Sequence, residues 1–80
     1  MHFTLRFSPG DETKLIISVS KKIAKRAVVR NTIKRRVRAI FKNLKPKFGT
    51  YLVIARKDSE KIRGEELQSE ITRLIRSIKN

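Results

Sequence analysis

The stretch from Val29 to Leu44 repeats apolar residues at the spacing of an α-helix, and it is also strongly basic. Its apolar face holds Val29, Ile33, Val37, Ile40 and Leu44, with Phe41 at the edge. Pro46 cannot continue the helix, and Gly49 indicates the loop that follows. An apolar stripe over about four turns must be buried against a second layer of structure. The rest of the chain therefore has to supply a surface that covers this helix.

The opposite face of the predicted helix is cationic. It carries Asn31, Lys34, Arg35, Arg38 and Lys42, and Arg30 and Arg36 flank the apolar stripe. Like charges four residues apart on a helix repel each other by roughly a few tenths of a kcal/mol per pair. Lys25, Arg26 and Arg30 also stand near the helix start, where the helix dipole disfavours each cation by up to about 1 kcal/mol at low salt. A purely structural helix has little reason to accept these penalties, so this face predicts a polyanionic partner.

The net charge of +14 is concentrated in the middle of the chain. From Lys14 to Lys57 there are fifteen Lys or Arg and no Asp or Glu, whereas the other 36 residues carry six bases and seven acids. The positive charge therefore belongs to a folded region and not to a tail. A basic patch on a folded domain is typical of nucleic-acid binding.

Length and composition limit the remaining classes of protein. Eighty residues with 39% hydrophobic content predict one folded domain, residues 1–80. The chain has no cysteine, which removes disulfides and thiolate metal sites and fits a cytoplasmic protein. No apolar run approaches the length of a membrane span, and no signal-peptide pattern opens the chain. We therefore expect a single cytoplasmic domain.

Two strands are predicted before the basic helix. Residues 2–7 alternate, with Phe3, Leu5 and Phe7 on one side and His2, Thr4 and Arg6 on the other. The segment SPGDE, residues 8–12, has turn chemistry, because Pro9 fixes φ and Gly10 accepts a positive φ. The segment TKLIISVS, residues 13–20, is rich in β-branched residues and predicts the second strand. We expect the two strands to pair as an antiparallel hairpin.

A third strand and a second helix follow the basic helix. The nearly continuous apolar run TYLVIAR, residues 50–56, is expected of a strand buried on both faces. From about Gly64 a helix is predicted, with an apolar stripe of Leu67, Ile71, Leu74, Ile75 and Ile78. The order β-β-α-β-α predicts an α+β fold, a two-layer sandwich with helices against one sheet. In it, the basic helix joins two strands that could be parallel neighbours.

The residues do not predict a catalytic site on this chain. The only histidine, His2, lies on the polar side of the first strand, where we expect a surface position without a role. Glu66 and Glu70 share a helix face, as solvated carboxylates usually do, and Asp11 and Glu12 fall in a turn. With three glycines the chain has no phosphate-binding glycine loop. Metal-assisted hydrolysis needs converging oxygen ligands, and the basic region offers no carboxylate.

The cationic helix alone leaves several kinds of partner open. Arg and Lys neutralise phosphates, Arg also stacks on bases, and the amide of Asn31 can pair with a base edge or a 2′-hydroxyl, which suits RNA. A ribosomal or other structural RNA-binding protein fits these residues as well as a processing factor does. A DNA-binding module is less favoured, because no helix-turn-helix spacing precedes Val28. The aromatic residues are Phe3, Phe7, Phe41, Phe48 and Tyr51, and the first three are expected in the core.

The segment ISVSKKIAKRAVVRNTIKRRVRAIF, residues 17–41, closely resembles the signature of the bacterial ribonuclease P protein subunit. In that family a strand ending in Ser-Lys-Lys leads into an Ala-Val-x-Arg-Asn run and a helix rich in Lys and Arg. YLVIARK, residues 51–57, and EELQSEITRLIRSI, residues 65–78, are similar to the strand and helix that follow. The resemblance implies a fold like domain 2 of ribosomal protein S5, with a left-handed β-α-β crossover. General rules oppose that hand, since about 98% of such crossovers are right-handed.

The resemblance also implies an accessory role in a ribonucleoprotein enzyme. In that family the RNA subunit holds the catalytic Mg²⁺ ions and removes the 5′ leader from precursor tRNA. The protein binds the RNA through its arginine-rich helix and contacts the single-stranded leader. The implied partners are ribonuclease P RNA and precursor tRNA, with no membrane and no DNA partner, and the protein itself is expected to bind no cofactor.

The resemblance and the cationic face together give the expected contact residues. The expected RNA contacts are Lys21, Lys22, Arg30, Asn31, Lys34, Arg35, Arg38 and Lys42, and the candidate leader contacts are Thr4, Arg6, Ser18 and Ser20. Thr32 stands where the family usually has Arg. The family normally has a helix before the first strand, whereas this sequence starts at the strand. We therefore expect Thr4 and Arg6 to be more exposed than in longer relatives.

Overall fold

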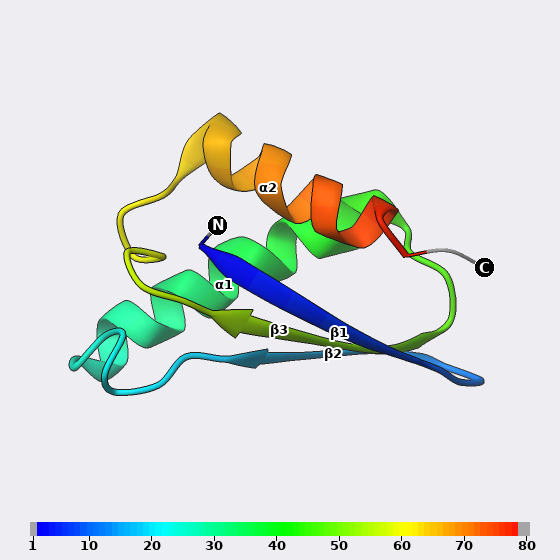
Figure 1. Cartoon of the computed structure of the whole chain (residues 1–80), viewed down its shortest axis with the longest axis horizontal. Coiled ribbons are helices and arrows are strands. Elements are labelled where there is room, and N and C mark those ends of the chain that lie inside the picture. Colours follow the sequence, from blue (N-terminus) through cyan, green and yellow to red (C-terminus); the bar gives the residue numbers. More distant parts are fainter. Residues whose placement is uncertain (1, 79–80) are drawn as a thin grey trace.

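Five elements follow one another in the computed structural model, which describes residues 2–78. They are β1 (Phe3–Pro9), β2 (Thr13–Ser18), α1 (Ala27–Leu44), β3 (Gly49–Ala55) and α2 (Gly64–Arg76). Figure 1 shows both helices on the same face of a three-stranded sheet. Helix α1 packs against β2 and α2, and α2 also packs against β1. The predicted α+β order and the two-layer arrangement are confirmed.

The sheet order is β1-β3-β2, so the predicted hairpin of the first two strands is wrong. Strand β3 lies between them, antiparallel to β1 and parallel to β2, and Gly49 pairs with both Pro9 and Thr13. Strands that flank a central strand are about 10 Å apart, and the four steps from Pro9 to Thr13 can span roughly 13 Å. The turn therefore reaches over the start of β3, where the N–H of Gly49 donates to the Glu12 carbonyl at 2.9 Å.

Burial along β3 alternates, so the expectation of a strand buried on both faces is also wrong. Tyr51, Val53 and Ala55 are buried, whereas Leu52 and Ile54 are half-buried. Residues paired in register point to the same side of a sheet, and both described helices cover the side of Tyr51. The other side, here called the open sheet face, carries Thr4, Arg6, Ser8, Lys14, Ile16, Ser18, Thr50, Leu52 and Ile54.

The core lies between the helices and the covered side of the sheet. It receives Ile33, Val37 and Phe41 from α1, Leu67, Ile71 and Ile75 from α2, and Phe3, Ile17, Tyr51, Val53 and Ala55 from the strands. Phe41, predicted at the edge of the α1 stripe, is one of its three buried residues. The centroid of its ring lies 4.9 Å from that of the Tyr51 ring, in an edge-on arrangement. The buried face of α1 is therefore centred closer to this large side chain than the sequence pattern predicts. Val29, Ile40 and Leu44 are consequently only partly buried.

Tyr51 fixes the loop between α1 and β3. Its ring lies 4.8 Å from that of Phe7, and its hydroxyl donates to the Lys47 carbonyl at 2.7 Å. Burial raises the pKa of this phenol above its ordinary value. Gly49 also fixes the path of this loop. Its φ is 150°, and a Cβ atom at this position would stand 2.4 Å from the Phe7 ring. Only glycine fits there, so the path of the loop is closely determined.

Helix α2 holds the start of β1 through Glu70. Oε2 of Glu70 accepts the backbone N–H groups of His2 and Phe3, both at 2.8 Å, and Oε1 lies 2.9 Å from His2 Nδ1. The Glu70 side chain is only 12% exposed. The expectations of a solvated Glu70 and of a His2 without a role are therefore wrong, because the packing of α2 over β1 brings together residues that are 68 positions apart. Glu66 is exposed, as predicted.

Candidate nucleic-acid interface

Helix α1 presents an exposed row of polar side chains, here called the α1 row. The α1 row consists of Asn31, Arg35, Arg38 and Lys42, which are all exposed and follow one another at steps of four, three and four residues. At a rise of about 1.5 Å per residue, the row extends over roughly 16 Å. Within residues 2–78, none of its cations forms an ion pair with an acid. The row is therefore a line of fixed positive charge open to solvent.

The other predicted cations of α1 lie differently. Lys34 is half-buried, and so is Arg36, which lines a groove with Glu60 and Arg63 of the following loop. Both side chains therefore lie beside the α1 row and not in it. Their alkyl stems cover the helix while the charged ends reach the surface.

Arg30 is half-buried and engaged by the backbone. Its Nη1 atom donates to the carbonyls of Ala24 at 3.0 Å and Lys25 at 2.8 Å. The side chain thus ties the loop before α1 to the first turns of the helix. That helix begins after Arg26 with no side-chain cap and no acid in its first turn. Arg30 therefore positions the entry to the helix in addition to adding charge.

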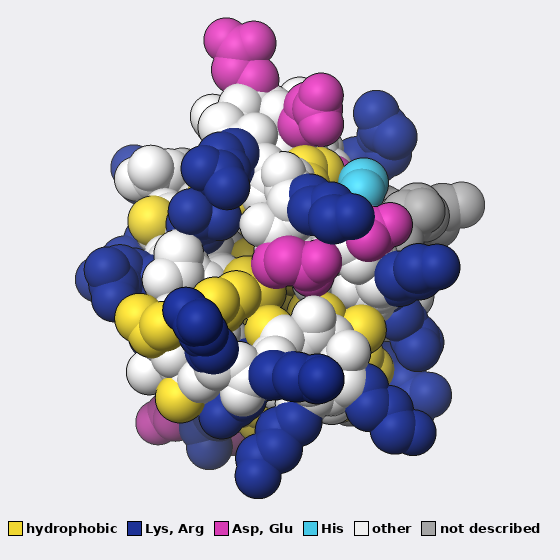
Figure 2. Space-filling view, turned by 90° about the vertical axis from the view of Figure 1, so that its left-hand side faces the viewer, with side chains coloured by type: hydrophobic (Ala, Val, Ile, Leu, Met, Phe, Trp, Pro, Cys, Tyr) yellow, Lys and Arg dark blue, Asp and Glu magenta, His cyan; other side chains and the backbone are white. Residues whose placement is uncertain are grey.

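Lys21 and Lys22 are exposed on a tight turn after β2. The Ser20 carbonyl accepts the N–H groups of Ile23 and Ala24, both at 3.1 Å, which closes this turn. Since Arg30 binds the Ala24 carbonyl, the structure brings the two lysines to the start of α1. Figure 2 shows this end of the molecule, with many Lys and Arg side chains around its lower half and most visible acids in the upper half.

The candidate leader contacts gather on the open sheet face, except for Ser20, which follows the end of β2. Thr4 and Ser18 flank Ile54 in one row across the sheet, and Arg6 and Ile16 flank Leu52 in the next. Arg6 and Ser18 are exposed, and Ile16 is 53% exposed. Thr4 is half-buried, and its Oγ1 atom is covered and has no hydrogen-bond partner in the described part of the chain. This face thus combines an apolar floor with one exposed arginine and small hydroxyls.

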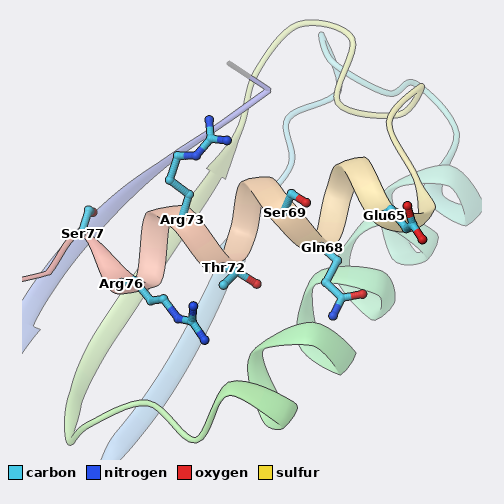
Figure 3. Close-up of a pocket in the computed structure, with 7 residues that line it drawn as sticks. All are labelled: Glu65, Gln68, Ser69, Thr72, Arg73, Arg76 and Ser77. Carbon is cyan, nitrogen blue, oxygen red and sulfur yellow. The ribbon is translucent and has the colours of Figure 1, made fainter.

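The described residues outside these surfaces do not form a metal-binding cluster. Within residues 2–78 there is no group of three His, Asp or Glu that could hold a metal ion, and no helix long and apolar enough to cross a membrane. A surface depression is lined by Glu65, Gln68, Ser69, Thr72, Arg73, Arg76 and Ser77. Figure 3 shows that these side chains come from one helical stretch and that Arg73 and Arg76 point to opposite sides of it. The depression is thus a shallow surface around α2.

One exposed residue was not assigned from the sequence. The sequence predicts a core position for neither Phe48 nor Tyr51, and the structure buries Tyr51 but leaves Phe48 67% exposed. The available signal was local, because Phe48 lies in a loop between Pro46 and Gly49, where an aromatic ring has no helix or strand to bury it.

The family model described as Ribonuclease P matches residues 1–79. The ribonuclease P protein component of Picosynechococcus sp. is 41% identical over 70 residues, which cover 84% of this chain and 60% of that protein. The component of Bacillus pumilus is 42% identical over 69 residues, covering 82% of this chain and 57% of that protein. That of Thermus oshimai is 35% identical over 75 residues, covering 94% and 49%. The chain thus spans about half to three-fifths of the length of these curated relatives.

A solved structure of the Staphylococcus aureus RNase P protein superimposes on 95% of this chain and 73% of its own, with a TM-score of 0.84 and 31% identity. A crossover of the opposite hand would place α1 on the other face of the sheet. A superposition this close therefore requires the same strand order and the same hand of the β2–α1–β3 connection in both structures.

Proposed function

We propose, from the premise that this chain belongs to the ribonuclease P protein family, that it binds ribonuclease P RNA and assists that RNA in removing the 5′ leader from precursor tRNA. The observation that carries the proposal is the α1 row, with its exposed cations free of acidic partners among residues 2–78. Lys21, Lys22 and Arg30 extend this charge to the helix start, and Lys34 lies beside it. The compartment that we propose is the cytoplasm.

The α1 row acts on RNA through its phosphates. Each Lys or Arg that approaches a phosphate releases condensed counterions, and this release supplies much of the binding free energy. Arg35 and Arg38 can also hold a phosphate through two parallel N–H groups. Asn31 adds an amide that pairs with a base edge or a 2′-hydroxyl. The apolar side of α1 keeps this row rigid, because Ile33, Val37 and Phe41 are buried in the core.

The proposed assistance is electrostatic. Folding the catalytic RNA and bringing precursor tRNA to it places phosphates close together, and diffuse cations must screen them. Fixed charges of the protein replace part of that screening. The chemistry of hydrolysis is supplied by Mg²⁺ ions held by the RNA, and we assign no residue of this chain to that step. The protein should therefore matter most at low Mg²⁺ concentration.

The open sheet face is the proposed leader contact. Ile16, Leu52 and Ile54 offer an apolar floor for unstacked bases, and Arg6 is placed to meet a phosphate or to stack on a base. Ser18 and Ser20 provide exposed hydroxyls for sugar and phosphate oxygens, whereas the covered hydroxyl of Thr4 does not reach the surface. The strand residues of this face include no aromatic side chain, so base stacking contributes less there than charge and apolar contact.

Reconstitution tests the proposal. The chain is combined with a bacterial ribonuclease P RNA and a precursor tRNA that carries a 5′ leader, and cleavage is followed over a series of Mg²⁺ concentrations. We expect the chain to lower the Mg²⁺ concentration that cleavage requires, and to cleave nothing without the RNA. Cleavage by the RNA-free protein, or an unchanged Mg²⁺ requirement in its presence, would contradict the proposal.

A matched pair of variants links that result to α1. Arg35→Ala with Arg38→Ala removes two exposed charges from the α1 row, whereas Arg73→Ala with Arg76→Ala removes two exposed charges from α2. The first variant should lose most of the assistance at low Mg²⁺, and the second should keep it. Equal losses would mean that net charge matters and that the α1 row does not.

A further inference from the structure

Phe48 is the one aromatic side chain among the large hydrophobic residues that the described chain leaves exposed. The other two are Ile16, at 53%, and Val28, at 64%, compared with 67% for Phe48. Ile16 continues the apolar floor of the open sheet face, and Val28 lines a groove with Val29. Phe48 stands in the loop between α1 and β3, and the apolar contacts of that end of the core are already made by other rings.

The exposed ring stands on a fixed loop. On one side the Lys47 carbonyl accepts the Tyr51 hydroxyl at 2.7 Å, and the Lys47 ammonium lies 5.6 Å from the centroid of the Phe7 ring. On the other side Gly49 donates its N–H to the Glu12 carbonyl at 2.9 Å. Phe48 is therefore held between two anchored residues, and a binding partner would not have to order the loop first.

The core has no place for this ring. Phe7, Tyr51 and Phe41 already pack together at this end, with centroid distances of 4.8 and 4.9 Å. Gly49 lies so close to the Phe7 ring that even a Cβ atom does not fit between them. A phenylalanine at position 48 thus gives up the stabilisation of burial, which a polar residue in the same loop would not do.

The charge around the ring differs from one side to the other. The segment from Lys42 to Phe48 contains three lysines and no acid, and Lys42 and Lys45 are exposed. Across the Gly49 hydrogen bond lies the turn with Asp11 and Glu12. Phosphates are favoured on the lysine side and repelled on the acidic side. A neutral, flat group with amino donors is the chemistry that suits the ring itself, and an unpaired nucleobase has both properties.

We propose that Phe48 stacks on one unpaired base of the RNA that the α1 row binds, with Lys42 and Lys45 at the phosphates beside that base. The inference rests on the proposed function, because it assumes that ribonuclease P RNA follows α1. It adds a contact beyond those proposed for the open sheet face, since Phe48 belongs to the loop that precedes β3. The base supplies the stacking surface, so the contact depends on an unpaired nucleotide and little on its identity.

Leucine and tryptophan at position 48 separate stacking from other contacts. Phe48→Leu keeps an apolar side chain but removes the ring, and Phe48→Trp keeps an aromatic surface. With ribonuclease P RNA alone, Phe48→Leu should weaken binding about fivefold to 150-fold, which is the range for one stacked base. Phe48→Trp should bind as tightly as the wild type. The salt dependence of binding should be the same in all three proteins, because the ring carries no charge.

Tryptophan also reports the contact directly. The chain contains no tryptophan, so the emission of Phe48→Trp comes from position 48 alone. We expect ribonuclease P RNA to quench that emission and to shield it from acrylamide. An unchanged emission with RNA bound, together with wild-type affinity of Phe48→Leu, would overturn the stacking contact while the proposed function stands. If the wild type binds no ribonuclease P RNA, the proposed function itself fails.

Self-association is the rival use of an exposed ring. Sedimentation of the RNA-free protein tests for self-association. A contact between two copies through Phe48 would give dimers in the wild type and monomers in Phe48→Leu. That outcome would also overturn the proposal. We expect a monomer for both proteins, with the same denaturant midpoint, so that the loss of affinity is a property of the contact and not of the fold.

Discussion

The carboxylate of Glu70 accepts the backbone N–H of Phe3 at 2.8 Å, although 67 positions separate the two residues. The same oxygen accepts the N–H of His2, and the Glu70 side chain is 12% exposed. Removal of the carboxylate leaves two N–H groups of an edge strand without an acceptor, which destabilises the folded state by roughly 1–3 kcal/mol. We expect Glu70→Ala to lower the free energy of unfolding by about this amount, as measured by denaturant titration.

Two further variants control this prediction. Glu66→Ala removes an exposed carboxylate one helical turn earlier and should change stability by less than about 1 kcal/mol. Glu70→Gln keeps one acceptor oxygen, so its free energy of unfolding should lie between those of Glu70→Ala and Glu66→Ala. If Glu70→Ala and Glu66→Ala proved equally stable, the contact with β1 would have no role in holding the strand.

Tyr51 predicts a loss of stability in alkali. Burial raises its pKa above the ordinary 10.0, so the folded protein holds the phenol proton more tightly than the unfolded chain does. The unfolded chain binds fewer protons above about pH 10, and the contribution of Tyr51 is complete below that pH and lost as pH rises through the folded pKa. Tyr51 is the only tyrosine, so tyrosinate absorbance reports this residue alone. That absorbance should appear at higher pH in the folded protein than in the unfolded chain.

Tyr51→Phe is the control for the alkaline effect. All other residues are common to both proteins, so the difference between the two stability curves isolates the phenol. We expect the variant to be less steeply destabilised above about pH 10. Parallel curves for the two proteins would show that the phenol ionises equally easily in both states.

Val37 and Arg38 are neighbours with opposite roles. Val37 is 0% exposed in the core, whereas Arg38 stands in the exposed α1 row. Val37→Ala should lower the free energy of unfolding by about 1–3 kcal/mol and leave RNA affinity unchanged wherever the protein stays folded. Arg38→Ala should weaken RNA binding with little change in stability. A core variant that lost RNA affinity while still folded would contradict this division.

Arg30 should affect both properties. Its side chain donates to the carbonyls of Ala24 and Lys25, and these bonds hold the turn that carries Lys21 and Lys22. We expect Arg30→Ala to lower stability by about 1 kcal/mol. It should also reduce the slope of log K against log salt by more than the roughly 0.7–0.9 that one phosphate contact contributes. Arg35→Ala is the matched single variant, and an identical reduction in both would show that Arg30 adds charge only.

The regular elements could be predicted because their signals are local. The apolar period of α1 and α2 and the alternation of β1 depend on neighbours along the chain, so the order and the approximate bounds followed from the sequence. The pairing of β1 with β2 was predicted wrongly, because turn chemistry at Pro9 and Gly10 does not tell whether a third strand enters between the two. The open side of β3 was missed for a similar reason, since Leu52 and Ile54 are as apolar as residues covered by helices.

The residues of the candidate site also divide into those with a local signal in the sequence and those without one. The exposure of the α1 row, including Arg35 and Arg38, could be predicted because a helix fixes which residues lie opposite the apolar stripe. The backbone contacts of Arg30 depend on the path of the preceding loop, and the contact of Glu70 with β1 depends on how α2 packs. Neither has a signal in a single sequence. The expected left hand of the crossover rests on the family resemblance, because the general rule favours the opposite hand.

The claim that the α1 row binds RNA phosphates is tested most directly by the salt dependence of binding to ribonuclease P RNA. Wild type, Arg35→Ala with Arg38→Ala, and Arg73→Ala with Arg76→Ala are compared over a range of salt concentrations. The first variant should reduce the slope of log K against log salt by about 1.4–1.8, the contribution of two phosphate contacts, and the second should leave it unchanged. An unchanged slope in the α1 variant, or the same reduction in both variants, would contradict the claim.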